Sequence, residues 1–409
     1  MKLVVDNKEF AECMKKILPA VEVSREKKEA AEGAISLMVT NRKVGDDYFG
    51  IAVAYDGKKQ LFCIFRAAEL EMEKEKEEVY VSGKRLCDIC SAMDNGKEVP
   101  LSIEVDKYCL VRKGGSQVQL PLGECPVIIN PSDDWYIRTK VSTSELAGLL
   151  VKGGRFYRAG ADNATADVCI AFDLERGRIH ASSTDAYKLG MAGIGAKFEE
   201  GDRLKQLTEA MQKEEGEVPP TFNLTEGRIK IQIEGEQLKT LSRFMDMRAD
   251  KTEVLVFEKY VYFKTGVDIA LFMLKDVSEK PYAFEGTLSM AKGHSRKGSM
   301  HMAPKDILDA LTVFDVANQD EEPHVYIKKD KSGAISFSTK GKVSKTLVAC
   351  ETKDAVSDMV LNSKILRQVV SCYDKEEKVT IIIGEKNEPV LIQDREDSED
   401  FCIISKVEK

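Results

Sequence analysis

A few side chains of this sequence carry groups that could do redox, metal or nucleophilic chemistry. Cys87 and Cys90 stand in a C-x-x-C spacing, which redox dithiols and zinc sites use. No second pair of ligands follows at the spacing of a zinc site, and the stretch around the two cysteines has the periodicity of a helix. We therefore expect Cys87 and Cys90 to pack in a core as reduced thiols.

The histidines form no metal pattern, because they lie far apart at His180, His294, His301 and His324. His180 stands near Ser183 and Asp185, which are the residue types of a hydrolase triad. Neighbouring positions of a strand alternate between faces, which argues against a triad along one strand. The sequence also lacks a Walker loop, a G-x-G-x-x-G motif after a strand and an H-E-x-x-H motif. We expect no catalytic residue, no metal and no cofactor, and a protein that is not an enzyme.

The composition is typical of a soluble globular chain of two to four domains. The chain has 409 residues, of which 43% are hydrophobic and 32% charged. No apolar run approaches the ~18 residues of a membrane span, and the first residues turn polar too soon for a signal peptide, so we expect a cytoplasmic protein. The net charge of −8 argues against a protein that adheres to nucleic acid over its whole surface. This net charge is compatible with a molecule that has an acidic outer surface and a basic inner surface.

One pattern, a helix followed by strands, occurs three times along the chain. The three helices read VSGKRLCDICSAM, IEGEQLKTLSRFM and LNSKILRQVVSCY. Leu86, Leu238 and Leu366 hold equivalent places in them. Self-similarity at long spacing indicates three like domains in a curved array or a ring.

Each repeat also opens with an earlier amphipathic helix. In the first copy Phe10, Met14 and Ile17 fall on one helix face, and Asp6 or Asn7 can cap the helix. The other copies read SELAGLLVK and PKDILDALTVF. Strand pairs with alternating apolar residues follow: AISLMVTN with YFGIAVAYDG, DVCIAFDL with RIHASSTD, and HVYIKK with AISFSTKG. Such alternation predicts antiparallel sheets with one buried face, and hence an α+β fold.

Polar, turn-rich stretches between the repeats suggest the domain boundaries. We predict domains at 1–133, 134–287 and 288–409. Residues 196–220 have no counterpart in the other two copies, and we expect them to form a helical surface insertion. A tolerated extension of a loop and a dedicated partner site are both open explanations of this insertion.

The order of these motifs resembles that of the bacterial sliding clamp, the beta subunit of the replicative DNA polymerase. STDAYKLGM is similar to that family's T-D-G-H-R-L-A segment, and RLCDIC to its F-F-D-I-C segment. The resemblance spans nearly the whole chain. It implies three DNA-clamp domains per chain, each with two helices and antiparallel sheets, and a head-to-tail homodimer that forms a six-domain ring. Such a ring slides on duplex DNA and tethers DNA polymerase, the clamp loader and other replication and repair proteins.

Helix geometry gives such a ring a suitable bore. Six domains with two inner helices each place twelve helices around a pore. At roughly 9 Å between axes the circle is about 34 Å across, which leaves a bore of roughly 25 Å once the helix thickness is removed. A DNA duplex passes through this bore with room for water. A ring holds DNA by topology and needs only weak, sequence-blind phosphate contacts.

The pore hypothesis requires basic residues on the exposed faces of the repeat helices and in one loop. The candidates are Arg25, Lys27, Lys28, Lys84, Arg85, Lys152, Arg155, Arg158, Lys239, Arg243, Lys305, Lys364 and Arg367. Any exposed helix face carries some basic residues, so ordinary solvated surface is the alternative for each of them taken singly.

The resemblance also implies an apolar pocket, between the middle and last domains, for a short linear peptide from partner proteins. By position its residues are Cys169, Thr184, Ala186, Tyr187, Lys188, Leu189, Pro281, Phe284, Cys402, Ile403 and Ile404. The family usually has Gly and His where this chain has Ala186 and Tyr187, and it ends in Met-Pro-Met where this chain ends IISKVEK. Ordinary strand-core positions are the alternative for these residues.

The resemblance further implies a dimer seam between an edge strand of the first domain and the last domain of a partner chain. It suggests Val118 and Leu120 meeting Phe314 and Val316, although all four could be core residues of their own domains. The alternative function is a clamp-like ring diverted to a scaffold role for a restricted set of partners. The departures in the pocket and the insertion at 196–220 favour that alternative.

Overall fold

The structure is a computed structural model of the chain. It describes residues 1–21, 34–94, 99–124, 128–213, 217–225, 227–277, 282–317, 323–339, 345–354, 356–375, 377–394 and 398–407. The chain divides into two compact units of three segments each. Unit 1 comprises Met1–Ser144, Lys197–Pro219 and Gln237–Leu274, and unit 2 comprises Glu145–Ala196, Pro220–Glu236 and Lys275–Lys409. The middle of the chain therefore contributes to both units.

Unit 1 is built, within its described residues, on one antiparallel sheet of thirteen strands. Ten strands follow the order β13-β9-β16-β17-β18-β4-β1-β6-β7-β8, and β3, β2 and β5 continue from β4. Their bounds are β1 Lys2–Val5, β2 Ala34–Val44, β3 Asp47–Tyr55, β4 Lys59–Glu71, β5 Lys76–Ser82, β6 Leu101–Val105, β7 Cys109–Lys113, β8 Ser116–Leu120, β9 Ile137–Ser142, β13 Phe198–Glu200, β16 Lys251–Val256, β17 Tyr260–Thr265 and β18 Asp268–Met273.

Unit 2 contains, in its described part, a sheet of ten strands and a sheet of four. The larger sheet has the order β14-β15-β10-β11-β12-β27-β26-β25-β19-β23, and the smaller one has the order β22-β21-β20-β24. The bounds are β10 Asp167–Asp173, β11 Arg178–Thr184, β12 Lys188–Gly195, β14 Phe222–Thr225, β15 Arg228–Glu234, β19 Gly298–Met302, β20 His324–Lys329, β21 Ile335–Ser338, β22 Lys345–Val348, β23 Glu351–Asp354, β24 Met359–Asn362, β25 Val379–Ile383, β26 Val390–Gln393 and β27 Phe401–Ile404.

Two strand pairings explain why the chain groups into two units although its sequence repeats three times. In unit 1 β18 pairs with β4, with Ala270 opposite Leu61, and so joins the first and middle repeats. In unit 2 β12 pairs with β27, with Leu189 opposite Ile403, and so joins the middle and last repeats. A continuous ladder of backbone hydrogen bonds therefore crosses each repeat boundary. The division into three domains remains a prediction.

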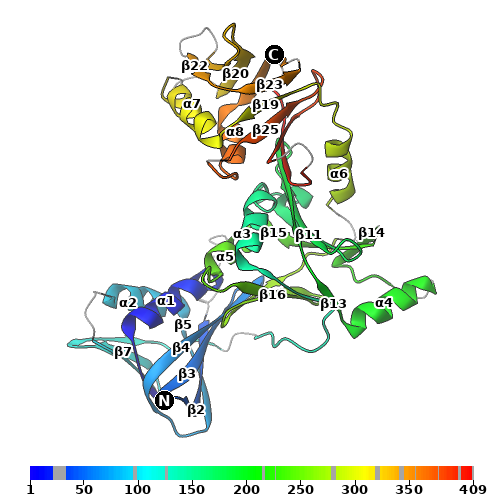
Figure 1. The fold of residues 1–409 in the computed structure, drawn as a ribbon. Helices are drawn as coiled ribbons and strands as arrows, with labels where there is room; N and C mark the ends of the chain where they lie inside the picture. Colours follow the sequence, from blue (N-terminus) through cyan, green and yellow to red (C-terminus); the bar gives the residue numbers. More distant parts are fainter. Residues whose placement is uncertain are drawn as a thin grey trace. The chain divides into compact units, whose positions relative to one another are not determined.

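The helices lie where the apolar periodicity predicted them. In unit 1 α1 (Asn7–Ile17) and α2 (Gly83–Met93) pack together (Figure 1). α3 (Thr143–Lys152) and α5 (Gly235–Phe244) belong to the middle repeat, and α7 (Pro304–Ala317) and α8 (Ser363–Val370) to the last. Leu86, Leu238 and Leu366 are 0%, 3% and 1% exposed, which confirms their equivalent buried positions in α2, α5 and α8.

The first helix shows how local sequence produces this arrangement. Asp6 caps α1, because its side chain accepts a hydrogen bond from the N–H of Glu9 at 2.8 Å. Phe10 and Met14 are buried beneath it, as predicted. The ring of Phe10 meets Phe65 of β4 edge-on, with centroids 5.1 Å apart. A Cβ atom at Gly50 would lie 2.2 Å from the Phe65 ring, so a glycine in β3 makes room for this core.

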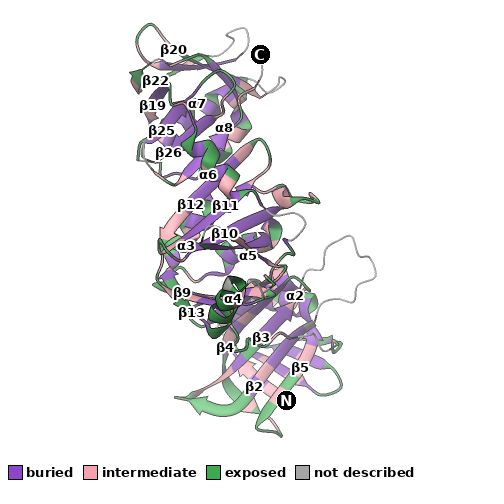
Figure 2. Ribbon diagram, turned by 90° about the vertical axis from the view of Figure 1, so that its right-hand side faces the viewer, coloured by how far each residue is buried: buried purple, intermediate pink, exposed green. Residues whose placement is uncertain are grey.

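Two further helices fall outside the repeat pattern. α4 (Asp202–Gln212) lies in the predicted insertion, where it follows β13. Leu204 and Leu207 are buried, whereas Met211 is 41% exposed and most other described residues of the helix are exposed, as expected of a surface insertion (Figure 2). α6 (Phe284–Lys292) occupies a stretch predicted to be turn-rich, and the boundary predicted after residue 287 falls inside it.

The predicted strand pairs are confirmed: β2 pairs with β3, β10 with β11 and β20 with β21, all antiparallel. The fold class is α+β with antiparallel sheets, as the alternation of apolar residues predicted. In the described part of the chain, no helix combines the length and the apolar character that crossing a membrane requires.

Candidate partner-binding pocket and basic helix surface

Side chains that hydrogen bond to nearby backbone hold the turn between β11 and β12. Asp185 Oδ1 accepts hydrogen bonds from the N–H groups of Tyr187 and Lys188 at 3.0 and 2.9 Å. Thr184 Oγ1 accepts one from the N–H of Ala186 at 3.1 Å and donates one to the carbonyl of Lys188 at 2.8 Å. Ala186 has φ +76°, a left-handed conformation that is uncommon outside glycine. The turn is closely constrained, and its Tyr187 is 64% exposed.

Residues 401–407, the last that the structure describes, lie beside this turn. β27 pairs with β12, with Lys188 opposite Ile404. Beyond β27, the N–H of Ser405 donates to the carbonyl of Tyr187 at 2.9 Å. The N–H of Val407 donates to the carbonyl of Val360 in β24 at 2.9 Å. The C-terminal segment is therefore held between the β11–β12 turn and β24.

A pocket of about 690 Å³ lies in unit 2 along these segments, within the range of ligand-binding clefts. Residues of the β11–β12 turn, α6, β24, the β25–β26 turn and the C-terminal segment line it. They are Thr184, Ala186, Tyr187, Lys188, Leu189, Met290, Asp358, Met359, Val360, Lys386, Asn387, Pro389, Ile403, Ser405, Lys406 and Val407.

The structure brings six of the residues predicted for the peptide pocket to this one surface: Thr184, Ala186, Tyr187, Lys188, Leu189 and Ile403. Cys169, Phe284, Cys402 and Ile404 do not line the pocket. Each of them is at most 1% exposed and belongs to a hydrophobic core of unit 2. Cys169, Cys402 and Ile404 face inward from strands, and Phe284 packs inward from the first turn of α6. Pro281 lies outside the described residues. That the pocket binds a peptide remains a prediction.

The sequence reasoning missed the lining residues that come from α6, β24 and the β25–β26 turn. Met290, Met359, Val360 and Pro389 stand in segments that look like ordinary core or turn. The two methionines are the informative signal, because flexible methionine side chains are common at surfaces that adapt to peptides. The chain lacks methionines at its C-terminus, and the pocket receives them from elsewhere in unit 2.

Lysines dominate the charges at the pocket rim. The ammonium of Lys188 pairs with Asp185 and lies 5.8 Å from the Phe156 ring centroid. Burial lowers the pKa of Lys406, whose Nζ donates to the carbonyl of Glu385 at 2.7 Å. Lys386 is exposed. Three lysines and one carboxylate, that of Asp358, line the pocket, so its electrostatics favour an acidic ligand over a basic one.

Basic residues of the repeat helices fall into two groups. Those with exposed side chains are Lys84 and Arg85 on α2, Lys239 and Arg243 on α5, Lys305 on α7, Lys364 on α8, and Arg155 and Arg158 after α3. Lys84 also forms an exposed ion pair with Asp88 at 3.3 Å. Arg25, Lys27 and Lys28 lie outside the described residues.

The other basic residues make contacts within unit 2. Lys152 forms an ion pair with Asp394, and its ammonium lies 5.3 Å from the Tyr373 ring centroid. Arg367 of α8 forms an ion pair with Asp315 of α7 at 2.8 Å. These contacts join elements of unit 2, so Lys152 and Arg367 are less available to a phosphate than the exposed group. Within that exposed group, Arg155 also donates to Ser371 Oγ at 3.4 Å, just after α8.

The four residues predicted for a dimer seam differ in exposure. Val118 and Leu120 belong to β8, which ends the path of paired strands in unit 1. Val118 is partly exposed and Leu120 is buried. On α7, Phe314 is 2% exposed and packs in the core, whereas Val316 is 68% exposed. An edge strand offers unpaired backbone groups to another chain, but the seam itself remains a prediction.

The residues that first suggested chemistry have other partners. The thiol of Cys87 donates to the carbonyl of Met14 at 3.4 Å, and burial raises the pKa of Cys90. Ser183 Oγ donates to the carbonyl of Gly153 at 2.7 Å rather than contacting His180. The nine cysteines in the described ranges are free, and no group of three potential metal-binding side chains occurs in those ranges.

Comparison with known proteins gives one clear result, at the level of structure. No family model and no curated protein sequence matches the chain. A sliding clamp (DNA polymerase III subunit beta) from Pseudomonas aeruginosa bound to griselimycin matches with a TM-score of 0.77 and 14% identity over 100% of both chains. A sliding clamp from Bacillus subtilis (TM-score 0.76, 14% identity) and a DNA polymerase III beta subunit from Thermotoga maritima (TM-score 0.75, 12% identity) match over 100% of this chain and 99% of theirs.

These similarities extend over the full length of the chain, whereas the sequence identity is too low for sequence comparison to detect. The resemblance drawn from the repeats and from the STDAYKLGM segment is confirmed by structure. The chain therefore has the fold of the bacterial sliding clamp, the beta subunit of DNA polymerase III.

Proposed function

We propose that this chain is a sliding clamp, a non-enzymatic processivity factor of the cytoplasm that encircles duplex DNA and tethers DNA polymerase. The observation that carries the proposal is the likeness in fold to sliding clamps over 100% of the chain, at a TM-score of 0.77. A local motif can recur in unrelated proteins, whereas a likeness over the whole chain extends to all three repeats. Function still has to be argued from the sites, because one fold can serve several functions.

Exposed basic residues on the repeat helices support DNA binding. Lys84, Arg85, Lys239 and Arg243 are exposed on α2 and α5, the corresponding helices of two repeats. The chain as a whole carries a net charge of −8, so its contacts with phosphates are few and local. Weak contacts of this kind suit a ring that slides, because strong ones would hold the ring in one place.

A charge-reversal experiment tests the DNA contacts. We expect changing Lys84, Arg85, Lys239 and Arg243 to Glu to weaken binding to duplex DNA and to reduce its salt dependence, by about 0.9 in the log–log slope for each phosphate that is no longer neutralised. The matched control reverses four exposed lysines of unit 1 that lie away from the helices: Lys107, Lys251, Lys259 and Lys264. Equal DNA binding by the two variants, both folded by circular dichroism, would show that the helix residues do not face DNA.

Ring formation requires two chains, and β8 with α7 is the proposed seam. Light scattering across a dilution series should give a mass of twice 45.6 kDa. We expect Val316→Asp to shift the dimer towards monomer, because Val316 is 68% exposed in the single chain and a charge buried at a seam has no partner. Val267→Asp, at a 60% exposed position between β17 and β18 and outside the proposed seam, serves as the control. A wild-type chain that stays monomeric at all concentrations would refute the homodimer.

The pocket beside Tyr187 is the proposed docking site for short linear peptides of DNA polymerase and the clamp loader. Tyr187 is 64% exposed at the pocket rim, so Tyr187→Ala should leave the fold intact. Loss of an aromatic anchor should weaken peptide binding about thirtyfold, measured by fluorescence polarisation with a generic clamp-binding peptide. Tyr108→Ala, at a 41% exposed tyrosine of unit 1, is the matched control.

The departures at Ala186, Tyr187 and the C-terminal segment keep a second function in view, that of a clamp-like ring used as a scaffold for a restricted set of partners. The same assay separates the two functions. Binding of a generic clamp-binding peptide at the Tyr187 pocket favours the processivity factor. A chain that dimerises and binds DNA but ignores that peptide favours the restricted scaffold.

A further inference from the structure

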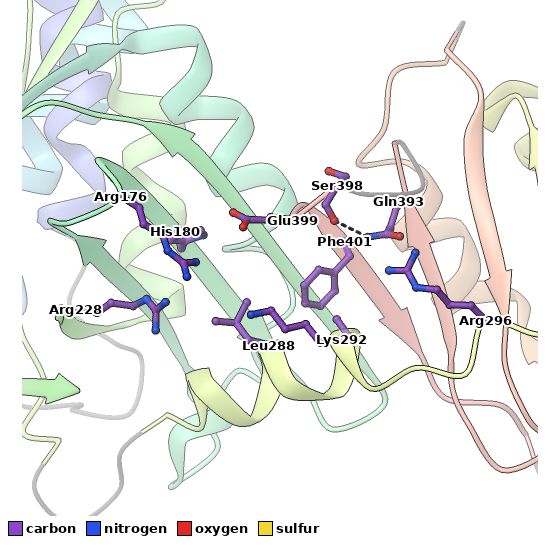
Figure 3. Close-up of a pocket in the computed structure, with 11 residues that line it drawn as sticks. Arg176, His180, Arg228, Leu288, Lys292, Arg296, Gln393, Ser398, Glu399 and Phe401 are labelled. Atoms are coloured by element: carbon purple, nitrogen blue, oxygen red, sulfur yellow. Dashed lines mark hydrogen bonds between the residues drawn. The ribbon is translucent and has the colours of Figure 1, made fainter. Parts of the chain in front are cut away.

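A second cavity, of about 220 Å³, lies in unit 2 between α6 and the larger sheet. Figure 3 shows Leu288 and Lys292 on the side of α6 that faces the strands, with Phe401 and Glu399 opposite them. None of its lining residues lines the pocket beside Tyr187. They are Arg176, His180, Arg228, Leu288, Ala291, Lys292, Arg296, Gln393, Ser398, Glu399 and Phe401.

Positive charge dominates the lining of this cavity. Arg176, Arg228, Lys292 and Arg296 contribute four cationic groups, and Glu399 contributes one carboxylate. Among the residues that the structure describes, the lining therefore has a formal excess of three positive charges, whereas the whole chain has a net charge of −8. An acidic protein that collects cations around one small cavity creates a local site of attraction for anions.

Ion pairs lie beside these cations, and Asp173 is within 4.0 Å of Arg176 as well as of Arg228. Arg228 Nε lies 2.9 Å from Asp173, and both side chains are at most 8% exposed. Arg178, which does not line the cavity, pairs with Glu399 at 3.2 Å. The two residues behind the lining, Asp173 and Arg178, therefore add one carboxylate and one cation. The paired Asp173 also fixes the Arg228 guanidinium in place, and an oriented guanidinium is well suited to bind a carboxylate or a phosphate.

Two buried polar atoms in the lining lack a hydrogen-bond partner among the residues that the structure describes. They are Nδ1 of His180, a residue that is 4% exposed, and Oε1 of Gln393, a residue that is 1% exposed. The Nε2 of the same glutamine donates to the carbonyl of Ser398 at 2.6 Å, which fixes the amide. Buried polar groups are nearly always satisfied in folded proteins. Of these two atoms, only Nδ1 of His180 can donate to an anion, because it carries a proton in one tautomer, whereas Oε1 of Gln393 only accepts and requires a donor such as a hydroxyl group or water.

The remaining lining is apolar and leaves limited space. Leu288 and Ala291 come from α6, and the ring of Phe401 from β27. A volume of 220 Å³ lies below the roughly 300 Å³ at which sites for drug-sized ligands begin. The occupant is therefore small, with a charged end and an apolar end.

We propose that this cavity binds a small organic anion. Its carboxylate or phosphate is held by the cationic groups of Arg228 and Lys292, and its apolar part lies against Leu288 and Phe401. Arg296 lies at the opposite end of the cavity from Arg228 and adds only to the local positive charge (Figure 3). The site is independent of the proposed DNA clamp function, because none of its residues belongs to the proposed DNA surface or to the pocket beside Tyr187.

Calorimetric titration of the whole chain at low salt tests this site. The probes are phenyl phosphate and benzoate, with inorganic phosphate as the anion alone and benzyl alcohol as the neutral ring. Lys292→Gln removes one cation from an exposed position on α6 and should not disturb folding. Lys297→Gln is the matched control, at an exposed lysine outside the cavity.

We expect at least one aromatic anion to bind saturably, once per chain, and the tighter of the two shows which anion the site prefers. Binding should weaken about tenfold in Lys292→Gln and stay unchanged in Lys297→Gln. Benzyl alcohol should not bind. The proposal is overturned if neither aromatic anion saturates, if inorganic phosphate binds as tightly as both of them, or if the two lysine variants behave alike.

Discussion

Replacing Ala186 by glycine should stabilise unit 2, and the size of the effect follows from one backbone angle. Ala186 has φ +76°, in the left-handed region where a Cβ crowds the backbone. The equivalent turn of the first repeat has Gly57 at φ +89°. Its Asp56 Oδ1 accepts hydrogen bonds from the N–H groups of Lys58 and Lys59 at 2.9 and 2.8 Å, as Asp185 does in the second repeat. The same turn therefore carries glycine in one repeat and alanine in the other.

The magnitude comes from two opposing terms. A left-handed conformation costs an L-residue about 1–2 kcal/mol, which Ala186→Gly removes. Glycine has more freedom in the unfolded chain, which offsets about 0.4–1 kcal/mol. We expect Ala186→Gly to raise the free energy of unfolding by about 0.8 kcal/mol. Gly57→Ala should lower it by a similar amount, because a Cβ there would meet nothing within 4 Å and only the backbone conformation changes.

Hydrogen exchange measured by mass spectrometry can follow each turn by itself. Amides of β11 and β12 should exchange about fourfold more slowly in Ala186→Gly, since 0.8 kcal/mol is about a factor of four in the opening equilibrium. The single tryptophan, Trp135, lies in unit 1 and reports the effect of Gly57→Ala by fluorescence during urea unfolding. Faster exchange in Ala186→Gly, or no loss of stability in Gly57→Ala, would refute the assignment of strain to this turn.

Three further predictions concern stability. Burial, followed by the charge of Arg178, lowers the pKa of His180 from 6.5 to about 4, so its contribution to stability is complete above pH 6.5 and is lost as the pH falls towards 4. Between pH 7 and pH 5 the wild type should lose about 2 kcal/mol more unfolding free energy in urea titrations than His180→Asn, and equal losses would contradict the shift. Asp173→Ala should cost about 3 kcal/mol by removing the buried carboxylate that pairs with Arg228, whereas circular dichroism melts of Asp88→Ala, at an exposed pair, should match the wild type; similar melts for both variants would show that the buried pair has no special role. Gly201→Ala would place a Cβ 2.0 Å from the carbonyl oxygen of Trp135 and should cost about 2 kcal/mol by tryptophan fluorescence. Gly115→Ala, with nothing within 4 Å of the new Cβ, is its control, and equal stability of the two glycine variants would argue against the close approach.

The site shows where sequence reasoning met its limit. The resemblance placed the β11–β12 turn and Ile403 at a pocket, and the structure brings them to one. Met290, Met359 and Pro389 were missed, because each stands in a segment whose pattern describes only burial or a turn. In the other direction Cys402 and Ile404 were assigned to the pocket but pack in the core, because which strand face points inward depends on the sheets on either side.

The basic residues also show which features the sequence predicts and which only the fold decides. Their recurrence on repeat helices is visible in the sequence, and most of those described are exposed. Lys152 and Arg367 look the same as the others in the sequence, yet their ion pairs are with Asp394 and Asp315, which stand in other elements. A pattern of charged residues indicates which side of a helix faces outward. It does not indicate which carboxylate of another element will pair with a basic residue on that side.

The sequence by itself determined the local elements and their threefold recurrence. Apolar residues at helical spacing predicted α1 around Phe10, and alternation predicted the pairing of β10 with β11, because both depend on neighbours within one segment. Only the tertiary structure decided what lies beside what across the repeats. The pairing of Leu189 with Ile403, the pocket beside Tyr187 and the cationic cavity under α6 all depend on backbone ladders between segments far apart in the chain. Backbone hydrogen bonds are the same for every residue type, so the register that joins distant strands is set by the packing of whole sheets.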